Sequence, residues 1–181
     1  MLREDAIELI NSKVKNRNVL RHMLAVGAIM KNLAKYLNED EYKWELTGLL
    51  HDIDYEETCD NFIMHGIVAC EMLKGKVKDE ILRAIRAHNE ATGTMPESLM
   101  EKGLIAADAV SGLLIACALV MPSKNIQDVD IKTVKKKFKD KDFARGADRK
   151  RISKCEELGI PLEKFLEISL EGLKSAEMTS L

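Results

Sequence analysis

The amino-acid sequence predicts a single-domain, all-α fold for residues 1–181. Apolar residues recur at the spacing of a helix face along the chain, and no segment alternates apolar and polar residues for long enough to form a strand. The three prolines, Pro96, Pro122 and Pro161, fall where helices are expected to begin or end. A chain of 181 residues can bury a sizeable core and has the usual size of one domain.

Nine helices are expected, and local sequence supports several of their boundaries. Asn16 and Asn18 can cap the second helix, and Asp128 or Asp130 can cap a later one. The run Gly159-Ile160-Pro161 predicts the end of one helix and the start of the next. The expected helices span about residues 3–15, 18–37, 41–51, 62–74, 77–89, 97–120, 130–140, 142–157 and 162–176.

The segment from Gly103 to Met121 is nearly all apolar and is long enough to cross a bilayer. Asp108 lies inside it, and a carboxylate at that depth in a membrane is costly. Small residues, mostly alanine, make up much of the remainder. We therefore expect this segment to be the central buried helix of a bundle.

The overall composition argues against several classes of partner. The formal net charge is −2, so no large field attracts the chain to nucleic acid or to acidic membranes. The N-terminal residues carry charges where a signal peptide needs an apolar run. We expect a cytoplasmic protein with no membrane partner, and a homo-oligomer remains open. Scattered cysteines without a CxxC pair predict reduced thiols at Cys59, Cys70, Cys117 and Cys155.

All four histidines can be placed on the apolar face of an expected helix. His22, His65 and His88 each share such a face with aliphatic side chains, and His51 ends a leucine-rich helix. Asp108 lies on an apolar face of the buried segment. Taken singly, each histidine could be a core residue with one hydrogen bond. Together they would be a poor core, because each inward polar group left unpaired costs roughly 1–3 kcal/mol. A divalent cation would neutralise all of them in one cluster.

The adjacent pair His51-Asp52 is the sharpest local feature. Neighbouring residues on a helix diverge by about 100°, so they can share one ion only at a helix end or between helices. The run Leu49-Leu50-His51-Asp52 has this form, with apolar residues leading to two ligands where the helix finishes.

This arrangement resembles the HD-domain superfamily of metal-dependent phosphohydrolases, which carries a His, a His-Asp doublet and a distant Asp on a bundle of helices. His22 matches the first ligand, His51-Asp52 the doublet and Asp108 the last ligand. The resemblance implies an all-α bundle with a buried central metal site. Its metal-binding core would span about residues 18–120, and the C-terminal helices would span about 128–176.

The resemblance also bears on the number of metal ions. His65 and His88 resemble the two histidines that hold a second ion in some subfamilies, and Asp52 would then bridge both ions. With one ion, His65 and His88 would instead contact a substrate phosphate or a metal-bound water. Imidazole and carboxylate ligands suit one or two divalent transition-metal ions, namely Fe, Mn, Ni, Co or Zn.

The implied activity is a phosphohydrolase that uses metal-activated water on a phosphate ester or anhydride, with a nucleotide or related small molecule as substrate. Asp52, Asp54 and Glu90 are the candidate catalytic residues. Asp54 could take a proton from the attacking water, and Glu90 could orient a ligand or act as a general base, although a surface role is equally open for both. Asp54 and Tyr55 stand where many members have Gly or Ala and then a substrate-contacting Lys.

A phosphate substrate needs cationic partners, and residues 132–154 contain eleven basic and three acidic residues. Arg145 and Arg149 are four positions apart, so on a helix they would share a face that could bind phosphate. Arg21, next to His22, and Arg86, near His88, are further candidates. The segment could equally be a solvated helix face. Nucleic acid is not expected, because the chain has few aromatic side chains for stacking.

Two other functions fit the same ligands. A di-iron oxygenase of this fold would use the six possible ligands for oxygen-dependent C–H or C–P cleavage. A non-catalytic module would bind a nucleotide or a partner and keep the metal for structure.

Overall fold

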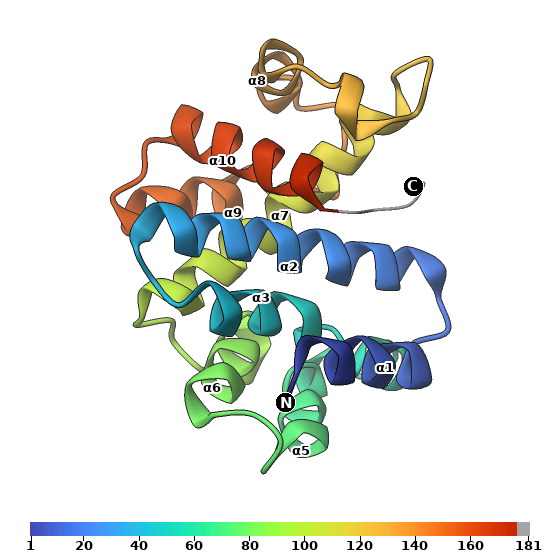
Figure 1. Ribbon diagram of the computed structural model, residues 1–181, viewed down its shortest axis with the longest axis vertical. Helices are drawn as coiled ribbons and strands as arrows, with labels where there is room; N and C mark the ends of the chain where they lie inside the picture. The colour runs from blue at the N-terminus through green and yellow to red at the C-terminus, as the bar shows by residue number, and fades with distance from the viewer. Residues whose placement is uncertain (177–181) are drawn as a thin grey trace.

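The computed structural model describes residues 1–176, and within them the chain forms ten α-helices and four short 3₁₀ helices with no strand (Figure 1). The predicted all-α fold is confirmed. In chain order the elements are α1 (Arg3–Lys13), α2 (Arg17–Leu37), α3 (Glu41–Leu50), α4 (Tyr55–Thr58), η1 (Phe62–Met64), α5 (Ile67–Leu73), α6 (Asp79–Ala87), η2 (Glu90–Thr92), α7 (Leu99–Leu119), η3 (Ile126–Asp128), α8 (Ile131–Lys139), α9 (Arg149–Ser153), η4 (Lys154–Leu158) and α10 (Leu162–Ser175).

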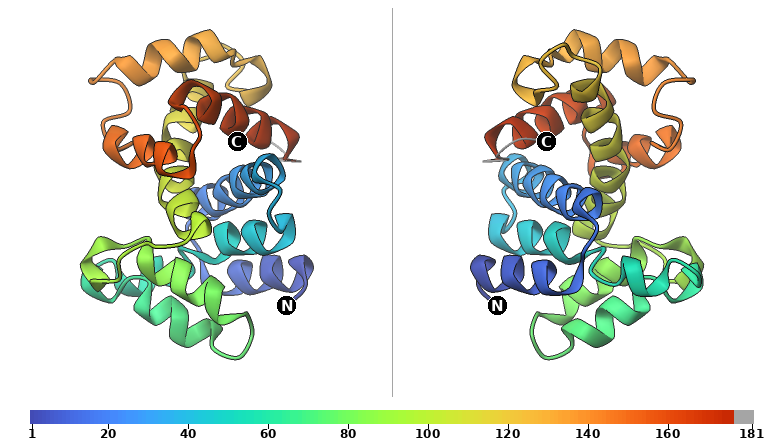
Figure 2. Two further views of the ribbon diagram at one scale, coloured as in Figure 1. Left: turned by 90° about the vertical axis from the view of Figure 1, so that its left-hand side faces the viewer. Right: turned by 90° about the vertical axis from the view of Figure 1, so that its right-hand side faces the viewer.

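Helix α7 runs through the middle of the bundle. Figure 2 shows α10, α2, α3 and α1 stacked one on the next along its side, with α5 and α6 towards one end and α8 towards the other. Helix α7 is the one described helix long and apolar enough to cross a membrane, yet most of its apolar window is buried inside the bundle. The prediction of a buried central helix is confirmed.

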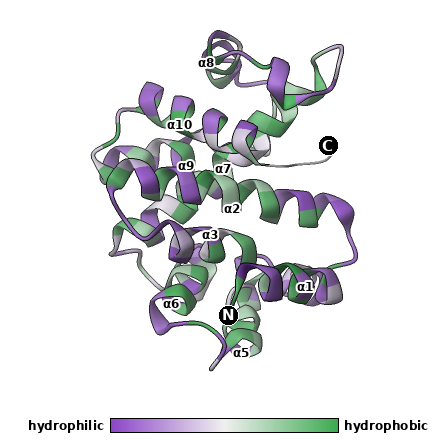
Figure 3. Ribbon diagram, viewed as in Figure 1, coloured by the Kyte–Doolittle hydropathy of each residue, from purple (hydrophilic) through white to green (hydrophobic). Residues whose placement is uncertain are grey.

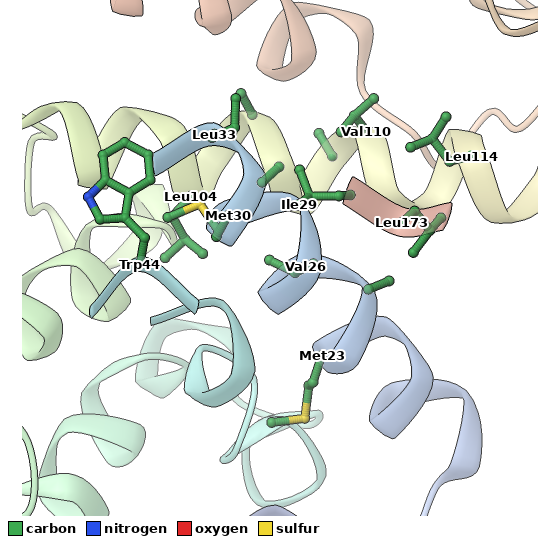
Figure 4. Packing of buried hydrophobic residues seen from close by; sticks show 14 of the residues in the cluster. Met23, Val26, Ile29, Met30, Leu33, Trp44, Leu104, Val110, Leu114 and Leu173 are labelled. Carbon is green, nitrogen blue, oxygen red and sulfur yellow. The ribbon is translucent and has the colours of Figure 1, made fainter. Parts of the chain in front are cut away.

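The core forms where α2 crosses α7. Figure 4 shows Ile29 and Leu33 of α2 close to Val110 of α7, with Trp44 of α3 and Leu173 of α10 at the two sides. Hydrophilic and hydrophobic residues alternate along α2 and α10, as expected for helices with one buried side (Figure 3). Burying such side chains stabilises the fold by about 1.5–3 kcal/mol each.

Two glycines let α2 and α3 approach closely beside the predicted metal ligands. A Cβ atom on Gly48 would lie 2.7 Å from the Cα of Gly27, so only glycine fits at position 48 without a backbone shift. His22 precedes Gly27 on α2, and His51 follows Gly48 at the end of α3. The close crossing therefore sets how near these two histidines lie.

Two predicted helices differ from the structure. The expected helix at 62–74 is interrupted: His65 has an extended backbone, and Gly66 has a φ of +85°, which favours glycine. The expected helix at 142–157 begins only at residue 149, where Asp148 accepts hydrogen bonds from two backbone N–H groups. His65 and Arg145 consequently lie in connections rather than on helix faces. The predicted caps Asn16 and Asp130 are present.

Candidate metal centre

Six side chains from separate parts of the chain meet at one point. His22 comes from α2 and Asp108 from α7, and both are partly exposed. The other four lie at helix ends or in connections, where neighbouring side chains can converge, and all four are buried: His51, Asp52, His65 and His88. The structure thus brings together all six residues that the sequence suggested as ligands.

One half of this cluster lies between α2, α3 and α7. The Nε2 atom of His22 lies 3.1 Å from Nε2 of His51 and 3.2 Å from Oδ1 of Asp108. The same nitrogen lies 3.4 Å from Oδ2 of Asp52. Four potential ligand atoms therefore surround a space suited to a single ion.

The other half lies between the end of α6 and the connection before α5. Nε2 of His65 lies 3.0 Å from Nε2 of His88 and 3.2 Å from Oδ1 of Asp52. Nε2 of His51 lies 3.3 Å from the same Oδ1. Asp52 thus directs one oxygen towards each half, the arrangement that a carboxylate bridging two ions requires.

Each histidine uses its other ring nitrogen, Nδ1, on an outer partner. The partners are the Gly48 carbonyl at 2.7 Å from His51, the Ile85 carbonyl for His88, Asp54 Oδ1 at 2.9 Å from His65, and Ser111 Oγ at 3.0 Å from His22. The Ser111 hydroxyl donates to the Asp108 carbonyl, so it accepts from His22. Each Nδ1 therefore carries a proton, and each Nε2 faces the centre, where its lone pair would bind a metal ion once any proton on it is displaced.

This donor set fits a divalent metal. Ring nitrogens 3.0–3.1 Å apart need either a proton or a cation between them, and a divalent metal can take the place of the protons. Burial lowers the pKa of His51 to about 4, so this imidazole is neutral at neutral pH, as a metal ligand must be. Burial alone would raise the pKa of Asp108, but His22 and Arg151 hold it well below its usual range. The carboxylate is therefore ionised.

Asp54 has a different place from the one expected of a catalytic base. Its side chain is fully buried, and its Oδ1 holds Nδ1 of His65. Its Oδ2 accepts the backbone N–H groups of Gly66 at 2.8 Å and Ala69 at 2.9 Å, which caps α5. Both oxygens are occupied away from the centre, so the prediction that Asp54 takes a proton from the attacking water does not fit. Asp54 positions His65.

Glu90 lies at the rim, outside the cluster. Its side chain is 75% exposed and its Oε1 is 3.5 Å from Nζ of Lys154. This placement favours the surface role that the sequence left open. The predicted catalytic residue Asp52, in contrast, lies at the centre of the cluster.

Arg149 does not have the phosphate-binding role that the sequence predicted. Its guanidinium donates to six backbone carbonyls, those of Lys137, Phe138, Asp140, Phe143, Ala144 and Ala147. These bonds hold the connection between α8 and α9 and leave no free edge for a substrate. The prediction of a shared helix face with Arg145 was wrong because residues 141–146 form turns instead of a helix.

The other three predicted arginines make no hydrogen bond or ion pair with the six cluster residues in the part of the chain described. Arg145 and Arg86 are exposed, and Arg21 is half-buried on α2. Their predicted substrate role therefore stays a prediction.

Sequence reasoning missed Arg151 as a site residue. Nη2 of Arg151 donates to Oδ2 of Asp108 at 2.8 Å and to the carbonyl of His88 at 3.0 Å. A usable signal was present: Cys155 is apolar and lies four positions later, so on a helix the two share an inward face. The basic run hid this signal, because its many lysines suggested a solvated surface.

The cluster opens to solvent on one side. The side chains of His22 and Asp108 are 23% and 20% exposed, whereas that of His51 is 0% exposed. Two exposed aromatic rings flank His65: Phe62 stacks on it with ring centroids 5.4 Å apart, and Tyr55 meets it edge-on at 5.9 Å. These two rings lie beside the half of the cluster that contains His65.

The fold and the site together define a class: a helical bundle whose imidazoles and carboxylates converge to form a candidate metal centre. The HD domain family matches residues 19–113, a range that includes all six cluster residues. The chain belongs to the HD domain family, the superfamily of metal-dependent phosphohydrolases, as its motif predicted.

Two curated relatives resemble part of the chain. Ribonuclease Y from Oleidesulfovibrio alaskensis is 34% identical over 99 residues, which cover 54% of this chain and 18% of that protein. The uncharacterised protein MJ0778 from Methanocaldococcus jannaschii is 32% identical over 106 residues, which cover 56% of this chain and 61% of that protein. The chain thus matches less than two thirds of either relative. No solved structure matches the chain significantly.

Proposed function

We propose that this protein is a metal-dependent phosphohydrolase that acts on a phosphate ester or anhydride, with a nucleotide or a related small molecule as substrate. The observation that carries the proposal is the convergence of four imidazole Nε2 atoms on the two oxygens of Asp52. Membership of the HD domain family supports the same chemistry.

The ligand atoms fall into two groups, which supports two ions over one. One group is formed by His22, His51 and Asp108, and the other by His65, His88 and Oδ1 of Asp52. A bound divalent ion would supply a water of lowered pKa and neutralise charge on a phosphoryl oxygen. Asp52 would hold both ions at a set spacing, and Asp54 would keep the His65 ring in its orientation.

The size of the substrate is inferred from the surroundings of the site. The name of one relative, Ribonuclease Y, indicates that it acts on RNA, but this chain matches only 18% of that protein. Phe62 and Tyr55 offer exposed rings beside His65, enough to stack one planar group such as a nucleobase. Aromatic residues make up only 4% of the chain, too few for a long stacking surface. We therefore favour a small molecule.

The test is elemental analysis of the purified protein, followed by hydrolysis assays on a panel of nucleotides and phosphoesters with Fe, Mn, Ni, Co and Zn. We expect bound transition metal and metal-dependent phosphate release. Asp52→Ala should lose both metal and activity, because it removes the carboxylate shared by the two groups. The matched control is Asp60→Ala, which removes an exposed carboxylate from the turn at residues 59–60. This variant should retain both metal and activity.

A di-iron oxygenase is the second candidate, and the split of the ligands around Asp52 is the observation that favours it. Iron-loaded protein that shows a mixed-valent di-iron signal and takes up oxygen, but releases no phosphate from the panel, would replace the hydrolase proposal. Protein that binds metal at full occupancy and turns over neither class of substrate would indicate a binding module.

A further inference from the structure

Arg151 places a positive charge at the edge of the metal centre. It projects from the short helix α9, and its Nη2 bridges the Asp108 carboxylate and the His88 carbonyl. Asp108 points its other oxygen, Oδ1, at Nε2 of His22. One carboxylate therefore separates the guanidinium from the ligand nitrogens.

The guanidinium is not saturated by these contacts. Arginine has five N–H donors, and the hydrogen bonds of Arg151 within residues 1–176 all come from Nη2. Its Nε is buried and has no partner there, although the side chain as a whole is 28% exposed. The exposed part of the side chain therefore lies elsewhere on the guanidinium, whose Nη1 has no hydrogen-bond partner within these residues either.

Two neighbouring basic groups are already engaged. Lys154, one turn later, lies 3.5 Å from Glu90, and Arg149 is used on backbone carbonyls. Arg151 also lies on the side where the cluster opens, since its partner Asp108 is 20% exposed. Its remaining donors are therefore held next to a residue of the centre, Asp108.

We propose that Arg151 binds a non-bridging oxygen of the substrate phosphoryl group and holds it against the metal centre. This inference rests on the proposed function. The planar fork of arginine suits phosphate, and charge-assisted hydrogen bonds of this kind are short and strong. The rival role, in which Arg151 only steadies Asp108, predicts an effect on metal binding and none on phosphate.

The experiment titrates inorganic phosphate into metal-loaded protein by calorimetry, with full metal occupancy checked by elemental analysis for each variant. Arg151→Gln should weaken phosphate binding roughly tenfold or more, because a charge-assisted hydrogen bond is worth about 1.5–3 kcal/mol. Arg151→Lys keeps the charge and should restore part of the affinity. Lys150→Gln, the exposed neighbour with no side-chain partner at the site, removes the same charge and should bind as wild type.

The outcomes separate the two proposals. Equal phosphate affinity of Arg151→Gln and wild type at equal metal occupancy would overturn the role of Arg151 alone. If Arg151→Gln cannot be loaded with metal, the phosphate affinity of metal-loaded Arg151→Lys decides between the two roles. Loaded Arg151→Lys that binds phosphate less tightly than wild type supports the role, and equal affinity would reduce Arg151 to a support for Asp108. Metal-loaded wild type that binds no phosphate and hydrolyses nothing on the panel would overturn the proposed function itself.

Discussion

At the scale of single residues, the site depends on outer partners that orient each imidazole. Metal ligation needs a neutral ring with its lone pair directed inward, and a hydrogen bond at the other nitrogen selects that tautomer. Backbone carbonyls do this for His51 and His88, whereas His65 depends on the buried carboxylate of Asp54.

Asp54→Asn should weaken metal binding about 10–100-fold without removing a ligand, because it abolishes the charged acceptor that orients His65. Metal affinity measured by competition with a chelator checks this. Asp60→Asn changes an exposed carboxylate that makes no hydrogen bond or ion pair with His65 among the described residues, so it should leave the affinity unchanged. Equal affinities for both variants would show that His65 needs no support from Asp54.

Metal binding should release about one proton per protein at about pH 7.5. In the metal-free protein, burial lowers the pKa of His65, but Asp52 and Asp54 outweigh burial and raise it to about 9. Its Nε2 is therefore protonated at neutral pH, and the metal must displace that proton. Metal affinity should rise with pH and level off above about pH 9. Calorimetry in buffers of different ionisation enthalpy measures the release, and binding without proton release would contradict the prediction.

At the scale of elements, short connections and close crossings place the ligands. The α2–α3 crossing brings His22 and His51 together, and Arg149 holds the connection that leads into α9 and Arg151. Neither feature contributes a ligand to the centre. Variants at these positions should therefore show how strongly the packing of the helices affects stability and metal affinity.

Gly48→Ala should destabilise the fold by about 1–3 kcal/mol, because the added Cβ forces the two helices apart. The same shift should separate His22 from His51 and lower metal affinity. Urea denaturation measures the loss of stability. Gly146→Ala is the control: a Cβ there meets nothing within 4 Å, so its stability should not fall. A Gly48→Ala protein as stable as wild type would show that α2 and α3 can shift to accept the added Cβ without loss of stability.

Arg149→Ala should destabilise the protein by roughly 2–4 kcal/mol, since several partly buried carbonyls lose a charged donor. Hydrogen exchange should accelerate most in residues 137–148. Arg145→Ala removes an exposed arginine from the same connection and should have little effect on stability. Similar unfolding midpoints for the two variants would count against a structural role for Arg149.

At the scale of the whole molecule, the metal would join parts of the chain that are far apart in sequence. Its ligands come from α2, α7 and the ends of α3 and α6, so an ion that binds only the folded state adds directly to stability. Without it, the ring nitrogens of His22 and His51, and those of His65 and His88, lie 3.0–3.1 Å apart with no metal ion to bind them together.

Removal of metal should lower the melting temperature, and restoring it should raise stability by about 2.7 kcal/mol at a hundredfold excess over Kd. Thermal unfolding at several metal concentrations measures this. The dependence should vanish in Asp52→Ala, which lacks the shared carboxylate, and persist in Asp60→Ala. A wild-type melting temperature that does not change with metal concentration would contradict a metal site formed by distant parts of the chain.

The sequence alone was sufficient for the fold class, the buried helix α7 and the family. Apolar periodicity identifies a helix, and inward polar residues on such faces stand out because burying them unpaired is costly. The helical pattern places the four histidines and Asp108 on inward faces, and the resemblance to the HD-domain superfamily then selects His22, the His51-Asp52 doublet and Asp108 as ligands. Their convergence within 3–4 Å is a property of the tertiary structure.

Only the tertiary structure decided the roles of the remaining polar residues. Arg149 and Arg151 lie two positions apart in one basic run, yet one binds backbone carbonyls and the other contacts Asp108. Asp54 could have faced the centre or its outer shell, and the turn at Gly66 placed His65 so that Asp54 supports it. A long side chain takes whichever partner the packing of distant segments brings within reach, and local sequence does not contain that information.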